Sequence, residues 1–125
     1  AAFEGKPIRV YGNGSQTRDF TYVSDIVGAN LLAMRYEGPE SVFNIGGGSR
    51  IALSAALEII SAGLGSRAGA EIVFEDPVHG DVMHTYADIS LARRELGYAP
   101  SVGLEEGLSR EIEWIESARR AARAG

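Results

Sequence analysis

Hydrophobic residues follow two spacings along the chain, and the shorter spacing predicts strands. Residues 8–11 alternate between apolar and polar and run into Gly12-Asn13-Gly14, a pattern typical of a strand that ends in a turn. Residues 42–45 form a short apolar run stopped by three glycines, and residues 71–74 form another that ends before Pro77. A further extended piece is expected at residues 19–23. The chain is therefore predicted to contain a few short strands.

Apolar residues at helical spacing predict four helices among and after these strands. The last is the longest, because Leu104, Leu108, Ile112 and Ile115 recur on one face and a basic tail follows that complements the helix dipole. The other three helices carry signals at both ends. The predicted caps are Ser24 or Asp25, Ser54 and Asp88, and the predicted ends are Gly38-Pro39, Gly65 and Gly97.

Alternating strands and helices predict an α/β fold in which a small, partly parallel sheet is flanked by helices. The length of 125 residues fits one domain with one modest core. Because the strands are few and short, we expect the sheet to keep an open edge, as in a piece of a larger protein. The opening residues 1–7 are similar to the end of a helix with Gly5 as its cap. This start suggests that further chain precedes it.

The composition argues against several classes of function. The net charge of −5 argues against a general nucleic-acid or anionic-membrane partner. No apolar run approaches the roughly 20 residues that span a bilayer. The absence of cysteine excludes disulfides and thiolate metal sites and fits a cytoplasmic protein. His79 and His84 lack the spacing and the neighbouring carboxylates of a metal site, so we expect no metal and interpret them as loop residues.

The densest polar cluster lies at residues 12–25, Gly-Asn-Gly-Ser-Gln-Thr-Arg-Asp-Phe-Thr-Tyr-Val-Ser-Asp. Its glycines are not a dinucleotide-binding loop, because no helix is predicted directly behind them. The turn instead delivers Gln16 and Arg18 into an extended piece. Arg18 could offer a two-pronged guanidinium to a pyrophosphate. The alternative is that Arg18 only pairs with Asp19 or Asp25 on the surface.

This cluster resembles the motif that opens the substrate domain of extended short-chain dehydrogenases/reductases, the UDP-glucose 4-epimerase-like epimerases and dehydratases of nucleotide sugars. Three further stretches agree in order and spacing, so the resemblance covers essentially the whole chain. They are Val-Phe-Asn-Ile-Gly at 42–46, Gly-Asp-Val at 80–82 with Thr-Tyr-Ala-Asp-Ile at 85–89, and Ala-Arg-Arg-Glu-Leu-Gly-Tyr at 92–98 leading to Leu-Glu-Glu-Gly-Leu at 104–108. The resemblance implies that residues 1–125 are the carboxy-terminal, nucleotide-sugar-binding portion of a Rossmann-type enzyme.

The resemblance also implies roles for particular residues. Arg18 matches the arginine that grips the nucleotide diphosphate, and Tyr11 matches the aromatic residue beside the base and ribose. Asp81 matches the carboxylate that accepts hydrogen bonds from the ribose hydroxyls, a role that suits a carboxylate facing a cis-diol. Further substrate contacts are expected at Arg9, whose backbone lies along the same wall, and at Gln16 and Thr85.

One departure from the family pattern precedes Asp81. The family commonly has Arg or Gln followed by Pro before this Gly-Asp pair, whereas this chain has Val78-His79. Either a second cation at the pyrophosphate is missing, or protonated His79 partly replaces it.

The catalytic parts of the family are not found in these residues. The general base of the family is a Tyr-x-x-x-Lys pair, and none of the five tyrosines has lysine four positions later. The glycine loop that binds NAD is missing too. We therefore expect an absent amino-terminal Rossmann domain to bind NAD and this chain alone to bind no cofactor. The nucleotide sugar and that domain are the expected partners, and a homodimer of the parent enzyme is a candidate assembly.

The reaction is left open at this point. A UDP-sugar 4-epimerase is the favoured parent enzyme, with a nucleotide-sugar 4,6-dehydratase or decarboxylase as alternatives. The chain could also be a non-catalytic nucleotide-binding or regulatory module, or an interaction protein that uses only its helical surface, because fold alone does not fix function.

Overall fold

The computed structural model of the protein describes residues 1–65 and 69–124 and has the predicted α/β architecture. Two short parallel strands, β1 (Ile8–Tyr11) and β4 (Ile72–Glu75), form one sheet. A second pair, β2 (Thr17–Arg18) and β3 (Ile51–Ala52), is antiparallel. The helices are α1 (Val23–Ala33), α2 (Leu53–Leu64), α3 (Ser90–Leu96) and α4 (Leu104–Ala124), and a 3-10 turn, η1 (Ala2–Glu4), opens the chain.

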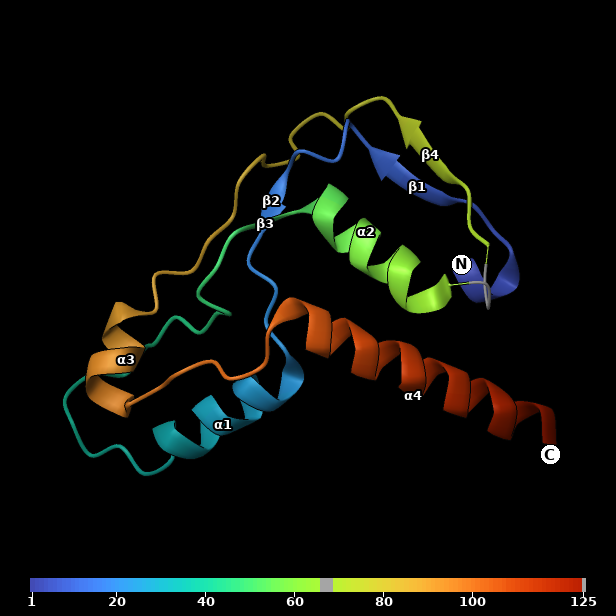
Figure 1. Ribbon diagram of the computed structural model, residues 1–125. Helices are drawn as coiled ribbons and strands as arrows, with labels where there is room; N and C mark the ends of the chain where they lie inside the picture. Colours follow the sequence, from blue (N-terminus) through green and yellow to red (C-terminus); the bar gives the residue numbers. More distant parts are fainter. Residues whose placement is uncertain (66–68, 125) are drawn as a thin grey trace.

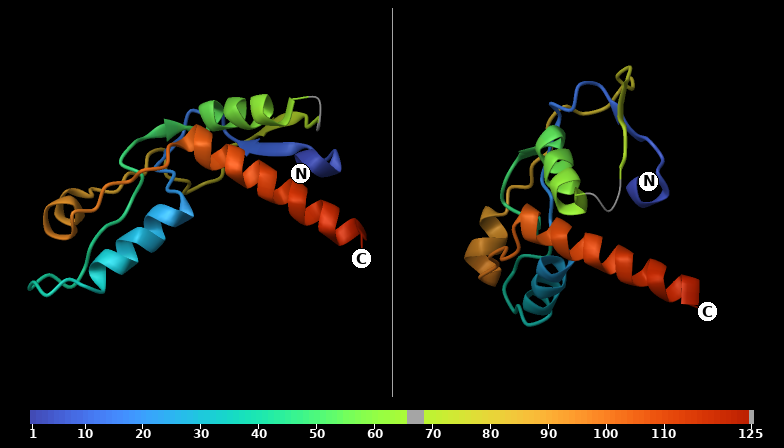
Figure 2. Two further views of the ribbon diagram at one scale, coloured as in Figure 1. Left: turned by 60° about the horizontal axis from the view of Figure 1, so that its bottom comes forward. Right: turned by 45° about the vertical axis from the view of Figure 1, so that its right-hand side comes forward.

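The elements gather into two groups (Figures 1 and 2). One group contains β1, β4 and α2, and the parallel pairing of the two strands requires a long crossover, which includes α2. The other group contains α1 and α3, packed around a core cluster centred on Ala29, Ile89, Ala92, Leu96 and Tyr98. Helix α4 starts between the groups and packs along α2. No described helix is both long enough and apolar enough to cross a membrane.

Most predicted elements are confirmed, with shifts of a few residues. The first strand has the predicted bounds, and β4 lies one residue later than expected. Gly65 and Gly97 end α2 and α3 as predicted, and Gly97 adopts the left-handed conformation that glycine favours. Gly5 closes η1 in the same conformation. The first helix ends at Ala33, earlier than predicted.

The strand predicted at residues 42–45 is wrong. This segment has no ladder partner, and Phe43 and Ile45 instead pack their side chains against the helical core cluster. Its end is tied down by polar contacts, because Tyr98 donates its hydroxyl hydrogen to the carbonyl oxygen of Gly46 at 2.9 Å. The piece expected at 19–23 also differs, since the pairing falls on Thr17 and Arg18 and α1 already begins at Val23.

Two of the predicted helix caps are wrong. Helix α2 begins one residue before Ser54, whose amide donates to the carbonyl oxygen of Gly14 instead. Helix α1 follows Tyr22 without a side-chain cap, and Asp25 already lies inside the helix. The third predicted cap, Asp88, lies one position before Ile89, which is the residue at the cap position of α3. The side chain of Asp88 still accepts a hydrogen bond from the amide of Ser90, the first residue of α3, at 2.9 Å.

Asp25 is one of the two buried polar side chains among the described residues. Its carboxylate accepts hydrogen bonds from the Ser101 hydroxyl at 2.8 Å and from the amides of Ser101 and Val102 at 3.2 Å. Burial, the largest influence, raises the pKa of Asp25, but these hydrogen bonds outweigh burial and leave the pKa below its ordinary value. Asp25 therefore fastens α1 to the segment that leads into α4.

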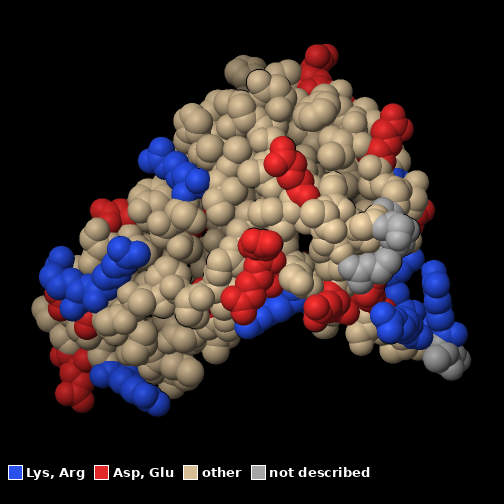
Figure 3. All heavy atoms as spheres, in the orientation of Figure 1, with Lys and Arg blue, Asp and Glu red and all other residues tan. Residues whose placement is uncertain are grey.

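Charged side chains are interspersed on the face seen in Figure 3, and basic ones gather where α4 ends. Arg119 on α4 donates to the Phe3 carbonyl oxygen at 3.2 Å and lies 3.6 Å from the Glu4 carboxylate. The last helix is thereby held against the opening turn of the chain.

Candidate functional site

The candidate site lies where the two parallel strands end. Tyr11 closes β1 and Glu75 closes β4, and the two residues are register partners. Parallel strands end at the same edge, so the loops that follow, residues 12–16 and 76–84, leave the sheet side by side. In open α/β sheets, ligands bind outside the carboxyl ends of the strands.

A cleft of about 450 Å³ opens at this edge. Its size falls within the range of roughly 300–1,000 Å³ that is usual for small-molecule sites. Both loops and both strand ends contribute to its lining: Tyr11, Gly12, Asn13, Ser15, Gln16, Glu75, Pro77, Val78, Asp81 and Met83. Three predicted site residues, Tyr11, Gln16 and Asp81, therefore share one cleft.

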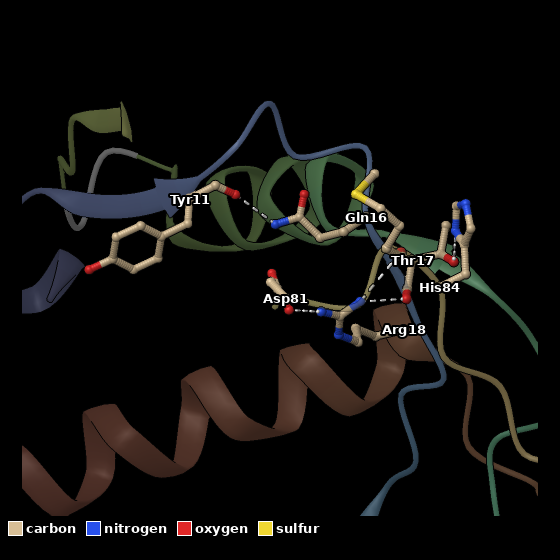
Figure 4. Close-up of polar contacts among 7 residues, drawn as sticks. Tyr11, Gln16, Thr17, Arg18, Asp81 and His84 are labelled. Atoms are coloured by element: carbon tan, nitrogen blue, oxygen red, sulfur yellow. Dashed lines mark hydrogen bonds and ion pairs between the residues drawn. The ribbon is translucent and has the colours of Figure 1, made fainter. Parts of the chain in front are cut away.

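Arg18 and Asp81 bind each other beside this cleft (Figure 4). The Nη2 atom of Arg18 lies 2.9 Å from Oδ1 of Asp81. Its Nη1 atom donates to the carbonyl oxygen of Thr17 at 2.9 Å and makes a longer contact of 3.5 Å with that of Met83. The side chains are 31% and 45% exposed, so both groups remain within reach of solvent and of a ligand.

The alternative prediction, that Arg18 only pairs with Asp19 or Asp25 on the surface, is wrong. Asp19 is engaged elsewhere, since its carboxylate accepts hydrogen bonds from the amides of Gly47 at 2.7 Å and Ala87 at 3.3 Å. Asp25 is buried against the segment before α4. The guanidinium of Arg18 therefore pairs with an acid of the second loop and not with the acids near it in sequence.

Gln16 and Tyr11 hold the first loop in shape. The side chain of Gln16 is buried, and its Nε2 atom donates to the carbonyl oxygen of Tyr11 at 3.0 Å. This bond closes the loop on itself, and it leaves the ring of Tyr11 about half exposed on the side of the loop where Arg18 and Asp81 lie (Figure 4). Gln16 thus acts on the cleft mainly through the backbone of Tyr11.

Arg9 and Thr85 lie outside the lining of this cleft. The guanidinium of Arg9 forms an ion pair with Glu75, across the β1–β4 ladder. Thr85 lines a separate, more polar hollow of about 390 Å³, together with Asp19 and residues 44–46. Its amide donates to the Thr17 carbonyl oxygen at 3.1 Å, which fastens the second loop to β2.

The two histidines of the second loop lie in different surroundings. His84 shares a hydrogen bond of 2.9 Å with the hydroxyl of Thr17, and His79 is exposed. Among residues 1–65 and 69–124, no group of three or more His, Asp or Glu side chains could hold a metal ion. The two glycine-rich turns run into β2 and β3 and not directly into a helix, so neither has the geometry of a dinucleotide loop.

Glu75 and Asn13 are two of the lining residues that the sequence did not lead us to predict as site residues. Glu75 is the last residue of its strand, and the rule that parallel strands end at one edge would have placed it beside Tyr11. Asn13 holds the tip of the first loop, because its side-chain oxygen accepts hydrogen bonds from both the amide and the hydroxyl of Ser15. Asn in a turn makes such contacts routinely, and this was the available signal.

Comparison with known proteins identifies the family to which this fold and cleft belong. Residues 1–111 match the family model described as GDP-mannose 4,6 dehydratase, so the chain belongs to this family. The fold is that of the Rossmann-type epimerases and dehydratases of nucleotide sugars, and the predicted resemblance to the carboxy-terminal portion of extended short-chain dehydrogenases/reductases is confirmed.

Several of the similar proteins are UDP-sugar 4-epimerases. The chain is 37% identical over 113 residues to the UDP-glucuronate 4-epimerase of Thermodesulfobacterium geofontis, which covers 90% of this chain and 34% of that protein. The UDP-glucose 4-epimerase of Thermotoga maritima, solved with UDP-glucose, is 34% identical with a TM-score of 0.84, covering 94% of this chain and 37% of that one.

A second solved structure is the UDP-glucuronic acid 4-epimerase of Bacillus cereus in complex with UDP-glucuronic acid and NAD. It is 32% identical with a TM-score of 0.82, and the match covers 94% of this chain and 40% of that chain. The present chain spans about a third of the length of the curated relatives it matches.

Proposed function

We propose that this chain holds the nucleotide half of a UDP- or dTDP-sugar within an NAD-dependent nucleotide-sugar epimerase or dehydratase, and that the parent enzyme is a UDP-sugar 4-epimerase. The observation that carries the proposal is that Tyr11 and Asp81 line one cleft where β1 and β4 end, and that Arg18 binds Asp81 beside it. A cation, a carboxylate and an aromatic ring are the groups that a nucleoside diphosphate needs. Solved epimerases with UDP-sugars support the same assignment.

Each group has a chemically suitable role. The guanidinium of Arg18 offers charge-assisted hydrogen bonds to the diphosphate oxygens, and the carboxylate of Asp81 accepts hydrogen bonds from the ribose hydroxyls. The half-exposed ring of Tyr11 packs beside the base and ribose. Gln16 positions the loop that carries Tyr11, while Arg9 and Thr85 border the site through backbone and ladder contacts.

The bond-changing chemistry belongs to other residues of the parent enzyme. No tyrosine of these 125 residues begins a Tyr-x-x-x-Lys pair, and NAD would be bound by an amino-terminal Rossmann domain. Binding energy gathered at the nucleotide places the sugar against that cofactor, which turns remote contacts into orientation of the reacting group. The homodimer and the cytoplasmic location stay predictions.

The proposal is tested with Arg18→Ala in the full-length protein. Loss of charge-assisted hydrogen bonds worth about 1.5–3 kcal/mol should raise the Kd for UDP at least about tenfold. Arg120→Ala is the matched control, because Arg120 is an exposed arginine on α4 that pairs with Glu116 of the same helix, away from the cleft. Calorimetric titration with UDP measures both variants. An Arg18→Ala protein that keeps its native circular dichroism spectrum and binds UDP as tightly as the control would contradict the proposal.

A further inference from the structure

The ion pair between Arg18 and Asp81 has a consequence for ligand choice, which rests on the proposed function. The roles proposed above turn the guanidinium to a diphosphate and the carboxylate to a ribose. In the structure the two groups bind each other at 2.9 Å. A ligand that engages both must therefore separate them or share them.

The contacts of Arg18 indicate which partner a ligand would displace. Its Nη1 atom is directed to the carbonyl oxygens of Thr17 and Met83, which belong to the backbone and stay in place. Its Nη2 atom is directed to Asp81, which lies on the flexible end of a side chain. A diphosphate that binds the guanidinium with two oxygens uses a hydrogen of Nη2 and brings negative charge beside the Asp81 carboxylate, so the two anions compete for that side of the guanidinium.

This competition should affect anions without a ribose more than nucleoside diphosphates. Inorganic phosphate or pyrophosphate displaces Asp81 and offers it nothing, and it also brings negative charge next to the displaced carboxylate. A nucleoside diphosphate displaces Asp81 too, but its ribose hydroxyls then donate hydrogen bonds to the freed carboxylate. We propose that Asp81 is a specificity-determining residue that occupies Arg18 and thereby selects nucleoside diphosphates over diphosphates that lack a ribose.

The expected change in ligand affinity when Asp81 is removed follows from the solvent exposure of Arg18 and Asp81. Both partners are partly exposed, and ion pairs near solvent contribute little, so removing Asp81 should strengthen the binding of a bare diphosphate by about two- to fivefold. The same change removes the acceptor of the ribose hydroxyls, and the loss of charge-assisted hydrogen bonds outweighs this gain, so UDP binding should weaken by about fivefold or more. The two ligands are expected to respond in opposite directions.

The experiment measures Kd for inorganic pyrophosphate and for UDP in the full-length protein, by titration followed with NMR, in wild type, Asp81→Ala and Asp76→Ala. Asp76 is an exposed acid on the same loop and controls for the change in net charge. Asp81→Asn, which keeps the shape of the side chain, is a second variant for the case that alanine disturbs the loop, and its shifts should have the same signs.

The expected result is tighter pyrophosphate binding and weaker UDP binding in both Asp81 variants, with little change in Asp76→Ala. Pyrophosphate that binds the Asp81 variants no better than wild type overturns the selective role. If UDP binding still depends on Arg18 in that case, the proposed function stands and only the selectivity is refuted. If UDP binding does not depend on Arg18, the proposed function itself fails, and the selectivity inference fails with it.

Discussion

Replacement of Asp25 by Asn should destabilise the protein more than any exposed acid-to-amide change. Asp25 is only 6% exposed, and its carboxylate accepts hydrogen bonds from one hydroxyl and two backbone amides. An asparagine amide has one acceptor oxygen, and its NH2 group would face backbone donors of Ser101 or Val102. The variant thus loses bonds to a charged group and brings two donors together.

The expected cost is about 2 kcal/mol in the free energy of unfolding, since hydrogen bonds to charged groups contribute about 1.5–3 kcal/mol. For a chain of this length this corresponds to a melting temperature lower by about 5–10 °C. Ser101→Ala removes the hydroxyl but keeps both amides, so it should cost less, about 1 kcal/mol.

The effect of Asp25 should also depend on pH. Because its pKa is lowered in the folded protein from the ordinary value of 3.8, the unfolded chain binds a proton at higher pH than the folded one does. The stabilisation is therefore complete above the unfolded pKa and is lost as pH falls through the lower, folded pKa. The difference in stability between wild type and Asp25→Asn should be constant near pH 7 and shrink below about pH 4.

Urea unfolding followed by circular dichroism at pH 7 and at several values between pH 3 and 5 measures both effects. Asp76→Asn serves as the control, since Asp76 is exposed on a loop and its neutralisation should change stability by less than about 0.5 kcal/mol. An Asp25→Asn protein as stable as this control at pH 7, or a difference that grows on acidification, would refute the reasoning.

Three further predictions concern the backbone and the exposed surface. Gly47→Ala should lower the melting temperature clearly, because a Cβ atom there would lie 2.2 Å from the carbonyl oxygen of Phe20. Gly28→Ala should raise stability by about 0.5–1 kcal/mol in denaturant unfolding, because Gly28 lies within α1 and its added methyl group meets nothing within 4 Å. Residues 1–125 expressed alone should bind a hydrophobic dye such as ANS and melt at low temperature, since Val23 and Leu31 on α1 and Met34 directly after it are at least half exposed; a sharp transition at high temperature would count against this.

The helices and the first strand were predictable from sequence because their signals are local. Apolar spacing and a closing glycine depend only on nearby residues, and Gly65 and Gly97 end their helices where expected. The predicted strand at 42–45 failed because an apolar run of four residues does not say what it packs against. Phe43 and Ile45 bury their side chains against α1 and α3 without pairing in a ladder.

The caps failed for a related reason. Asp25 has the residue type of a helix cap and lies near the start of α1, yet its carboxylate accepts hydrogen bonds from Ser101 and Val102, which lie 76 and 77 positions further along the chain. A partner so distant in sequence leaves no local signal. The partners in the ion pair of Arg18 with Asp81 are also far apart in sequence, and local reasoning offered Asp19 and Asp25 as partners of Arg18 instead. The resemblance to the family brought Arg18 and Asp81 together through their roles, but it did not predict their direct contact.

The cleft combines a rigid half and an adjustable half, and this division bears on affinity. Gln16 holds the backbone of Tyr11, and the Thr17 carbonyl oxygen holds one edge of the Arg18 guanidinium, so less freedom of the loop backbone and of Arg18 remains to be lost when a ligand binds. Asp81 is the adjustable part, because its position depends on one partly exposed ion pair. A nucleoside diphosphate would gain from the fixed groups and exchange one weak pair for two stronger sets of contacts. The order of importance for UDP affinity should therefore be Arg18 first, Asp81 second, and Gln16 through its effect on the loop.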